Sequence, residues 1–309
     1  MSILVVGSVA LDTVETPFGK AEEVLGGSAV FFSAAASLLA PVRVVGVVGE
    51  DYPMDDLRKA MNGEVDLSGV EQAPGESFRW SGVYSYDLNN RDTLETRLGV
   101  FADFKPRIPE AFRNSRYVFL GNIDPNLQLD VLNQVHNPEL VACDTMNFWI
   151  EGQREALLKL LERVDLLLVN DAEARQLAGE PNLLKAARWI LDRGPRMVVV
   201  KKGEHGAMFF HEDRVFFAPG YPLEEVYDPT GAGDAFAGGL MGYLASVGSM
   251  TVDDLKLATV FGSALGSFAV EDFSVRRFQS LTRDEIRVRV GEFQDMTSFE
   301  YDLAGQKDG

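Results

Sequence analysis

The sequence predicts an α/β fold: a doubly wound, mostly parallel sheet flanked by helices, with a small β lid. Two patterns predict the sheet. Short runs of Val, Ile and Leu without polar alternation recur along the chain, as in strands that are buried on both faces. Many of these runs are followed by segments with helical periodicity, which is typical of βα crossovers. A β-hairpin pattern in residues 77–99 interrupts this alternation and predicts the lid.

The predicted elements follow in chain order. Buried strands are expected at residues 3–6, 42–48, 117–120, 140–142, 166–169 and 197–200. Helices are expected at residues 29–39, 153–161, 172–177 and 183–191, across most of 239–268, and at 285–293. The polar residues from Tyr301 onward are expected to fray. Since no repeat or interdomain linker is visible, we expect one domain over residues 1–309.

The hairpin pattern consists of two alternating segments, 77–86 and 93–98, around a turn-like stretch at 87–92. Aromatic side chains on one face of such a hairpin need a ligand or a second subunit to cover them. We expect residues of about 12–24 and 77–99 to form a lid that closes over a ligand, and a homodimer through this lid is a candidate assembly. The aromatic residues concerned are Phe78, Trp80, Tyr84 and Tyr86.

The charge balance argues against several classes of partner. The 309 residues include 47 Asp and Glu against 29 Lys and Arg, a formal net charge of −18. Such a surface repels phosphate backbones and anionic lipid, so we expect neither nucleic acid nor a membrane as partner. Cys143 is the single cysteine, which rules out an internal disulfide. The chain opens on a predicted strand without a leader pattern, so we expect a cytoplasmic protein.

The most informative motif is Asp-Pro-Thr-Gly-Ala-Gly-Asp-Ala-Phe-Ala-Gly-Gly at residues 228–239. Gly231 and Gly233 allow successive backbone N–H groups to point into one concavity, and a helix follows directly. A glycine-rich loop that runs into a helix N-terminus is an anion site. A carboxylate beside such a site would repel the anion, so Asp234 makes chemical sense as a base that faces an acceptor hydroxyl.

A structural interpretation of this motif competes with the catalytic one. Asp234 could be a helix cap and the two glycines a simple turn, but the length of the motif favours catalysis. Two other phosphate loops are excluded. A dinucleotide fingerprint would need glycine where Phe236 stands. A P-loop needs Gly-Lys-Ser/Thr, whereas Gly19-Lys20 is followed by Ala21.

The stretch 228–239 resembles the C-terminal signature of the PfkB, or ribokinase-like, family of carbohydrate and nucleoside kinases. Gly26-Gly27-Ser28-Ala29, followed by an apolar helix, resembles the N-terminal signature. The resemblance extends over nearly the whole chain in the family's order. It implies a ribokinase-like fold, ATP and Mg²⁺ as cofactors, and a small sugar, polyol or nucleoside as the acceptor.

For the acceptor side, the resemblance implies that Asp12, five residues past Gly7, binds a substrate hydroxyl. Gly26 and Gly27 would be the backbone against which the substrate packs, and Ser28 is a further substrate-binding candidate. Polar residues that follow predicted strands are weaker candidates for the pocket, and turn capping explains them equally well. They are Asn122, Asp124, Asp144 and Asn147.

For the nucleotide side, residues 170–173 are similar to the family's Asn-x-x-Glu motif. Glu173 would organise Mg²⁺ through water and Asn170 would lie near the phosphates. Lys201, Gly203 and Gly206 resemble the strand-end turn that borders the nucleotide, with Lys201 where the family often has threonine.

The resemblance also implies an anion hole made by Gly231, Ala232 and Gly233, with Asp234 as the base. Thr230 belongs to the same loop and is a candidate for nucleotide binding. By analogy with some relatives, Asp228, Thr230 and the backbone of residues 267–271 could hold a monovalent cation such as K⁺.

The sequence therefore predicts an ATP-dependent kinase that phosphorylates a hydroxyl of a small sugar or polyol. A nucleoside kinase with the same mechanism is the alternative, because an aromatic lid suits stacking on a base. A non-catalytic sensor on this fold would need neither Asp234 nor Glu173, and a nicotinamide-dependent dehydrogenase lacks its fingerprint. The three histidines lack metal-ligand spacing, so we expect no metal site built on them.

Overall fold

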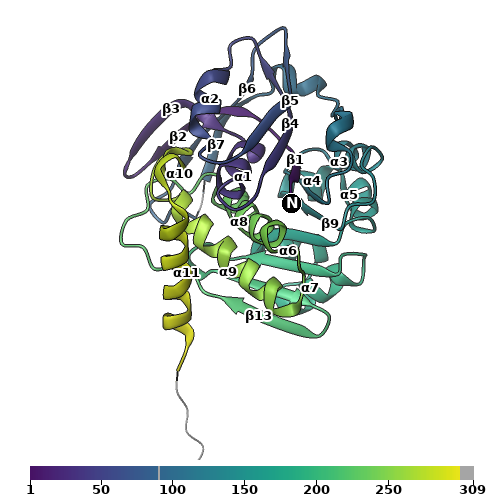
Figure 1. The fold of residues 1–309 in the computed structure, drawn as a ribbon, viewed down its shortest axis with the longest axis vertical. Helices are drawn as coiled ribbons and strands as arrows, with labels where there is room; N and C mark the ends of the chain where they lie inside the picture. The colour runs from purple at the N-terminus through teal and green to yellow at the C-terminus, as the bar shows by residue number, and fades with distance from the viewer. Residues whose placement is uncertain (90, 300–309) are drawn as a thin grey trace, which may run out of the picture.

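The main sheet has nine strands, whose bounds are known from a computed structural model that describes residues 1–89 and 91–299. They are β1 (Ile3–Val6), β4 (Val42–Gly49), β5 (Val65–Ala73), β8 (Tyr117–Leu120), β9 (Leu140–Asp144), β10 (Leu166–Asn170), β11 (Met197–Lys201), β12 (Ala207–His211) and β13 (Arg214–Ala218). Their order across the sheet is β13-β12-β11-β10-β9-β8-β1-β4-β5 (Figure 1). All neighbours are parallel except at β12 and β13, which pair antiparallel.

The six strands expected from apolar runs are confirmed. Strands β5, β12 and β13 were not expected; β5 and β13 are the two edges of the sheet. β12 and β13 contain short apolar runs at residues 207–210 and 215–218, but they form an antiparallel hairpin with no helix between them, so the βα alternation that marks the other strands does not extend to them. β5 alternates between half-buried and exposed positions over much of its length, so it carries no continuous apolar run. An edge strand faces solvent on part of its surface, which removes the signal that identifies a central strand.

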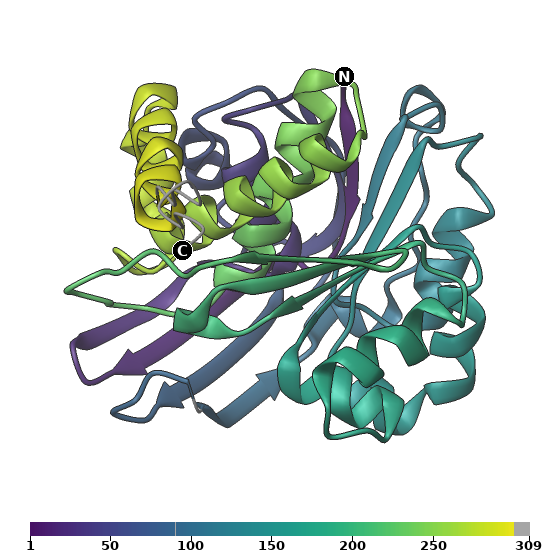
Figure 2. The same ribbon diagram turned by 90° about the horizontal axis from the view of Figure 1, so that it is seen from below.

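Helices cover both faces of the sheet. One layer contains α1 (Ser28–Ala36), α2 (Met54–Ala60), α8 (Ala232–Val247), α9 (Val252–Ala269), α10 (Arg276–Ser280) and α11 (Arg283–Thr297). The other contains α3 (Pro125–Leu132), α4 (Asn147–Gly152), α5 (Arg154–Leu161), α6 (Asp171–Ala178) and α7 (Leu183–Leu191). Figure 2 shows the sheet between the green and yellow helices on one side and the teal helices on the other.

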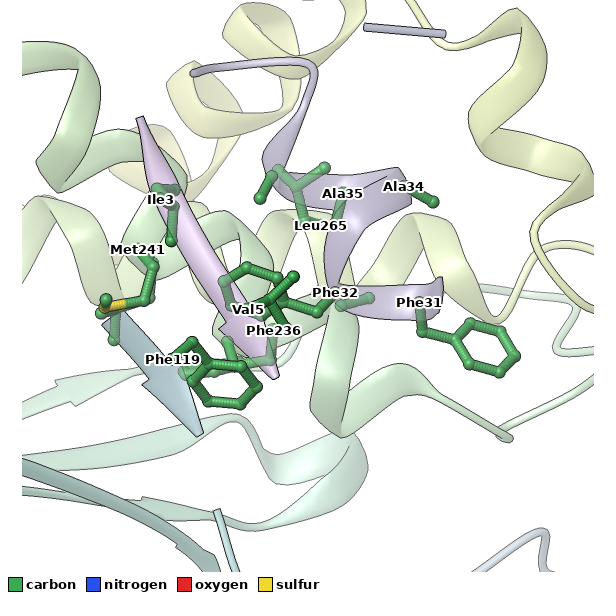
Figure 3. Close-up of a cluster of buried hydrophobic side chains, with 14 of the residues drawn as sticks. Ile3, Val5, Phe31, Phe32, Ala34, Ala35, Phe119, Phe236, Met241 and Leu265 are labelled. Atoms are coloured by element: carbon green, nitrogen blue, oxygen red, sulfur yellow. The ribbon is translucent and has the colours of Figure 1, made fainter. Parts of the chain in front are cut away.

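Strand β1 shows why the chain needs two layers. Ile3 and Val5 pack into the cluster with α1 and α8, whereas Leu4 and Val6 pack into the cluster with the other layer. All four side chains are fully buried, as the two-residue period of a central strand requires. Figure 3 shows Ile3 and Val5 in the first cluster.

A second, four-stranded sheet lies beside the main one. It consists of β2 (Ala10–Thr16), β3 (Gly19–Gly26), β6 (Phe78–Tyr84) and β7 (Arg91–Arg97), in the order β3-β2-β6-β7. The predicted hairpin is confirmed, because β6 and β7 pair antiparallel, while β2 and β6 are parallel. In Figure 2 these purple and blue strands project away from the helical layers. We call them the lid sheet.

Two sequence expectations fall partly outside the described residues. The predicted turn at 87–92 includes Asn90, and the predicted frayed end begins at Tyr301; both residues lie outside the described part of the chain. Within residues 1–89 and 91–299, no helix combines the length and the apolar character needed to cross a bilayer.

The parallel strands bring distant polar residues to one edge of the sheet. Strands β1, β8, β9, β10 and β11 run in the same direction. Their carboxyl ends therefore lie together, and each is followed or terminated by a polar residue. Open α/β sheets bind their ligands at this edge. The residues brought there are Ser8, Asn122, Asp144, Asn170 and Lys201.

Candidate active site

A cleft of about 2020 Å³ opens at the carboxyl edge of the main sheet and extends under the lid sheet. Among the residues proposed from sequence for substrate, nucleotide, Mg²⁺ and catalysis, all except Gly26 line it, whereas Asp228, proposed for a monovalent cation, does not. Gly26 lies behind Asp12 instead. The structure thus brings together in one cleft residues that are as far apart in the sequence as Asp12 and Asp234.

The loop before α8 has the shape expected of an anion site. Gly231 is the helix N-cap and has a φ of 76°, a conformation that favours glycine. A Cβ at this position would lie 2.2 Å from the ring of Phe31, so glycine is also needed for space. In Figure 3, the Phe31 ring points away from the other labelled core side chains. Within the described residues, the Gly233 N–H has no backbone acceptor, whereas Ala232 N–H donates to Pro229 at 3.3 Å.

Asp228 fixes the start of this loop. Its Oδ1 accepts a hydrogen bond from the Thr230 N–H at 2.9 Å, and its Oδ2 accepts one from the Ser274 N–H at 3.2 Å. The carboxylate is 1% exposed. These bonds account for its burial without a cation, and a monovalent cation at Asp228 and Thr230 stays a prediction.

Asp234 lies in the first turn of α8, in the wall of the cleft. Burial raises the pKa of its carboxyl to about 7, and the negative charge of Asp144 adds to the rise, while Lys201 and Arg91 act in the opposite direction. A carboxyl whose pKa is close to neutral is well suited to accept a proton from a hydroxyl and to release it later. The position and the raised pKa of Asp234 are those that a general base requires.

Lys201, at the end of β11, makes an ion pair with Asp144, at the end of β9. The distance from Nζ to Oδ2 is 2.9 Å, and the two side chains are 16% and 8% exposed. Burial acts to lower the pKa of Lys201, but the carboxylates of Asp144 and Glu173 outweigh it and raise that pKa. The ammonium is also near the anion loop, because a Cβ on Gly233 would lie 3.0 Å from Nζ.

Asn170 and Glu173 form a capping box at the start of α6. The Asn170 side chain accepts from the Glu173 N–H at 2.8 Å, and Glu173 Oε2 accepts from the Asn170 N–H at 2.8 Å. This reciprocal cap explains locally why the Asn-x-x-Glu spacing starts a helix here. Burial raises the pKa of Glu173, and the neighbouring Asp144 charge adds to the rise. A cation near Glu173 would stabilise its ionised carboxylate against burial and against the charge of Asp144.

The donor set around Glu173 fits a magnesium ion held mainly by phosphate and water. In residues 1–89 and 91–299, no group of three or more His, Cys, Asp or Glu side chains could cage a metal. Mg²⁺ does not require such a cage, since it commonly binds through one or two carboxylates together with nucleotide phosphates and waters. Glu173 Oε2 already accepts from a backbone N–H, which leaves its second oxygen for a cation or its water.

Asp12 lies on β2, where the lid sheet meets the main sheet, and is 5% exposed. A Cβ on Gly26 would lie 2.0 Å from Asp12 Oδ2, which explains the glycine at that position. Gly27 has a φ of 94°, and a Cβ there would lie 2.5 Å from the Ser8 carbonyl oxygen. Burial raises the pKa of Asp12 to about 7, the Asp228 charge adds to it, and a hydrogen bond from the Gly27 backbone opposes it.

The two remaining candidates for binding the substrate, Ser28 and Asn122, already make hydrogen bonds within the protein. The Ser28 hydroxyl lies 3.2 Å from the Ser8 hydroxyl and accepts from the Ser8 N–H at 3.1 Å. The Asn122 carbonyl accepts from the Trp149 indole N–H at 2.9 Å. Both residues line the cleft, so these contacts orient them within its wall.

The turn after β11 lines the cleft and approaches the tip of the lid sheet. Gly203 and Gly206 both have positive φ, at 55° and 85°. A Cβ on Gly203 would lie 3.0 Å from Oδ1 of Asn89, in the lid turn, and one on Gly206 would lie 2.1 Å from the Ala218 carbonyl oxygen. The two glycines let this turn pass close to the lid and to β13.

Sequence reasoning missed Arg91, which enters the cleft from β7 of the lid sheet. Its guanidinium lies 5.4 Å from the Trp80 ring centre, and its charge lowers the pKa values of Asp12, Glu173 and Asp234. The alternation of β7 carried a weak signal, because Arg91 and Thr93 share the face that lines the cleft. Nothing local indicates that this face meets Asp234.

Comparisons with known proteins agree with this geometry. Residues 2–281 match the sequence model of the pfkB family carbohydrate kinases. A cytidine kinase of Thermococcus kodakarensis is 30% identical over 249 residues, which cover 79% of this chain and 88% of the relative. An inositol 3-kinase of Arabidopsis thaliana is 24% identical over 93% of this chain and 79% of its own length. The crystal structure of an aminoimidazole riboside kinase from Salmonella enterica, complexed with aminoimidazole riboside and an ATP analog, superposes with a TM-score of 0.74. That match covers 94% of this chain and 100% of the other at 19% identity.

Proposed function

Because the chain belongs to the pfkB family of carbohydrate kinases, we propose that it transfers the γ-phosphoryl group of ATP to a hydroxyl of a small sugar or polyol. The observation that carries this proposal is the position of Asp234. Its carboxyl lies in the wall of the cleft at the start of α8, next to the glycine loop and close enough to Asp12 for the two charges to interact. The proposed base, Asp234, and the carboxylate proposed to bind the acceptor, Asp12, thus line the same cleft.

In the proposed reaction, Asp12 accepts a hydrogen bond from one hydroxyl of the acceptor and thereby orients it. The reacting hydroxyl gives its proton to Asp234 while its oxygen forms a bond to the γ-phosphorus. The bond from that phosphorus to the oxygen bridging the β-phosphorus breaks, and ADP leaves. Asp234 later returns the proton to solvent. Positioning supplies much of the catalysis in phosphoryl transfer, because the transition state is loose.

The backbone of Gly231, Ala232 and Gly233 is proposed to bind the negative charge of the transferring group. The first N–H groups of a helix lack intrahelical acceptors, and the helix dipole favours an anion there. Thr230, Asn170, Lys201, Gly203 and Gly206 are proposed to surround the nucleotide, since they line the adjacent part of the cleft.

Glu173 is proposed to hold Mg²⁺ through water. When bound with the nucleotide, this ion neutralises charge on the phosphate oxygens. The Asn170 N–H and the α6 cap keep the Glu173 carboxylate in its place at the cleft. A monovalent cation near Asp228 and Thr230 remains part of the proposal on analogy alone.

A nucleoside is the second candidate acceptor, and the aromatic wall of the cleft favours it. Phe31, Trp80, Tyr84 and Trp149 all line the cleft, and Trp80 and Trp149 are only half-buried, so these two indole rings are available to stack on a base. The similarity to a cytidine kinase points in the same direction. A nucleoside carries its hydroxyls on a sugar, so the roles of Asp12 and Asp234 would be unchanged.

The lid sheet is proposed to close over the bound acceptor and exclude water, which limits wasteful ATP hydrolysis. A homodimer through the lid sheet and a cytoplasmic location also belong to the proposal. Phe18 and Leu94 of the lid sheet region are 55% and 64% exposed, as a subunit contact would require of a monomer. Size-exclusion chromatography with light scattering tests the dimer, and a monomer at all concentrations would remove it.

The function is tested by following ADP formation from MgATP with a panel of sugars, inositols and nucleosides. We expect one acceptor class to raise the rate far above the hydrolysis seen without acceptor. A sugar or inositol as the best acceptor supports the lead proposal, and a nucleoside supports the second. If no acceptor raises the rate and MgATP leaves the thermal unfolding midpoint unchanged, the chain is not an active kinase. An unfolding midpoint that rises with NAD instead would support a dehydrogenase.

A further inference from the structure

The ammonium group of Lys201 lies beside the proposed anion hole. Its Nζ would be only 3.0 Å from a Cβ on Gly233, and the same side chain's Cε and Cδ would be 3.7 and 3.8 Å away. The lysine stem therefore runs along the face of the loop where a side chain at position 233 would project. Glycine at this position leaves room for the charged group. An ion pair serving only to join β9 and β11 would have no need to reach the loop.

The contacts of Lys201 leave donors available. An ammonium has three N–H groups, and within the described residues one hydrogen bond from Nζ is recorded, to Asp144 Oδ2 at 2.9 Å. Asp144 has a second partner, because its Oδ1 accepts from the Thr145 N–H at 2.8 Å. The ammonium can thus keep one hydrogen bond to Asp144 and still present donors to an anion in the cleft.

The backbone at the carboxyl ends of β8 and β9, next to the ion pair of Lys201 and Asp144, is held by hydrogen bonds. Gln128 is fully buried and its Nε2 donates to three carbonyl oxygens, those of Leu120, Gly121 and Asp144. This side chain ties the carboxyl end of β8 to that of β9. A charge that must act in a transition state is most effective when its support is already in place before the reaction.

The charges of the cleft show why a cation is needed at this place. The carboxylates of Asp12, Asp144, Glu173 and Asp234 all line the cleft. ATP is itself strongly negative, so its terminal phosphate meets an unfavourable local field. Three lysine or arginine side chains are among the described residues of the lining, namely Arg91, Lys105 and Lys201. Of these, Lys201 lies on the main sheet beside the loop.

We propose that Lys201 is a catalytic residue whose ammonium contacts the γ-phosphoryl group during transfer, and that Asp144 is the positioning residue that holds it. This inference rests on the proposed kinase function. In the reaction above, Lys201 stays protonated throughout and stabilises the charge on the equatorial oxygens of the transferring group. Its contribution adds to that of the Gly231–Gly233 backbone, and no further bond is made or broken.

The test compares nucleotides that differ by the γ-phosphate. Dissociation constants are measured by calorimetry for MgADP and for the Mg²⁺ complex of the β,γ-imido analogue of ATP, with wild type and Lys201→Met. We expect Lys201→Met to weaken binding of the imido analogue by ~10-fold or more and that of ADP by no more than ~2-fold. Turnover should fall by ~10²–10³-fold.

Two further variants separate catalysis from structure. Lys202→Met removes the neighbouring lysine, which does not line the cleft, and should leave both dissociation constants unchanged. Lys201→Arg keeps a cation at this position and should keep the preference for the imido analogue over ADP. This variant still tests the proposal if Lys201→Met folds poorly. Equal weakening of both nucleotides in Lys201→Met, or no weakening of either, would overturn the assignment. If wild type binds neither nucleotide, the kinase function itself fails and this inference with it.

Discussion

The side chains of Tyr84 and Thr230 join the lid sheet to the loop of the proposed anion hole. Thr230 Oγ1 donates a hydrogen bond to Tyr84 Oη at 3.2 Å. A second contact lies nearby, where Thr16 Oγ1 of the lid sheet donates to the Tyr227 carbonyl at 2.9 Å. Tyr84 comes from β6, and Thr230 directly precedes Gly231. These two contacts link the lid sheet to the loop of the proposed anion hole, so we expect closure of the lid to affect that loop.

Tyr84→Phe removes the contact between lid and loop while keeping the aromatic ring. One neutral hydrogen bond is worth about 1 kcal/mol, so we expect the KM for the acceptor to rise by ~3- to 10-fold and the unfolding midpoint to change little. Steady-state kinetics with acceptor and MgATP varied separately check this. A large fall in kcat with an unchanged acceptor KM would contradict a role in lid closure.

Asp234→Asn removes the base and keeps the shape of the side chain. Turnover should fall by at least ~10²-fold, the contribution typical of general base catalysis, because the acceptor hydroxyl loses its proton acceptor. Binding of MgADP should stay within ~2-fold of wild type, since the loop N–H groups are unchanged. Single-turnover kinetics and calorimetry provide the two readouts. Turnover similar to that of wild type would remove Asp234 from its role.

Gly231→Ala places a methyl group where the Phe31 ring lies, in a backbone conformation with a φ of 76°. Both effects destabilise the loop, so we expect a lower unfolding midpoint and a loss of activity of ~10-fold or more. Gly291→Ala is the matched control, because a Cβ there meets nothing within 4 Å in the middle of α11. That variant should gain ~0.5–1 kcal/mol of stability with unchanged activity.

Arg91→Gln should shift the pH dependence of the reaction. Burial raises the pKa of Asp234 to about 7, and Arg91 acts to lower it. The base is active when deprotonated, so kcat/KM should fall as the pH drops through this pKa. Without Arg91 the pKa rises further, and the acid limb of the profile should move to higher pH. An acid limb that stays in place would show that Arg91 does not act on the base.

Asp12→Asn should alter the pH dependence of stability. The folded-state pKa of Asp12 is raised from 3.8 to about 7, first by burial. Folding therefore favours the protonated carboxyl, and the wild type loses stability as the pH rises through this range. The amide is not affected, so the variant's unfolding midpoint relative to wild type should increase between pH 5 and pH 8. Glu15→Gln, an exposed change on the same strand, should show no such trend.

The central elements of the fold were predicted from local patterns. The six apolar runs became strands because a central strand of a parallel sheet needs apolar side chains on both faces, and no other residue pattern meets that need. The glycine loop before α8 was equally visible, since a φ of 76° at Gly231 depends on the residue itself. Strands β12 and β13 were not identified, although residues 207–210 and 215–218 are apolar, because this antiparallel hairpin lacks the helix that follows each strand of a βα unit.

Most residues of the candidate site were singled out from the sequence, but the contacts between them were not. Lys201 and Asp144 were each singled out, yet their ion pair joins the ends of β11 and β9 across the intervening strand β10, an arrangement that only the strand order of the sheet creates. Arg91 was missed because its side chain becomes relevant only when the lid sheet brings its charge near Asp234, which is far away in the sequence. A Glu173 cap, by contrast, could be expected from spacing alone, since both partners lie within four residues.

By itself, then, the sequence determined the six central strands, several of the helices, the glycine-dependent turns and the candidate base Asp234, all of which depend on residues within a few positions of one another. Only the tertiary structure decided which charges meet in the cleft and how far burial shifts their pKa values. These properties depend on distances between segments far apart in the chain and on the removal of water around them. A local pattern of residues determines neither the distances between such segments nor the extent to which water is removed.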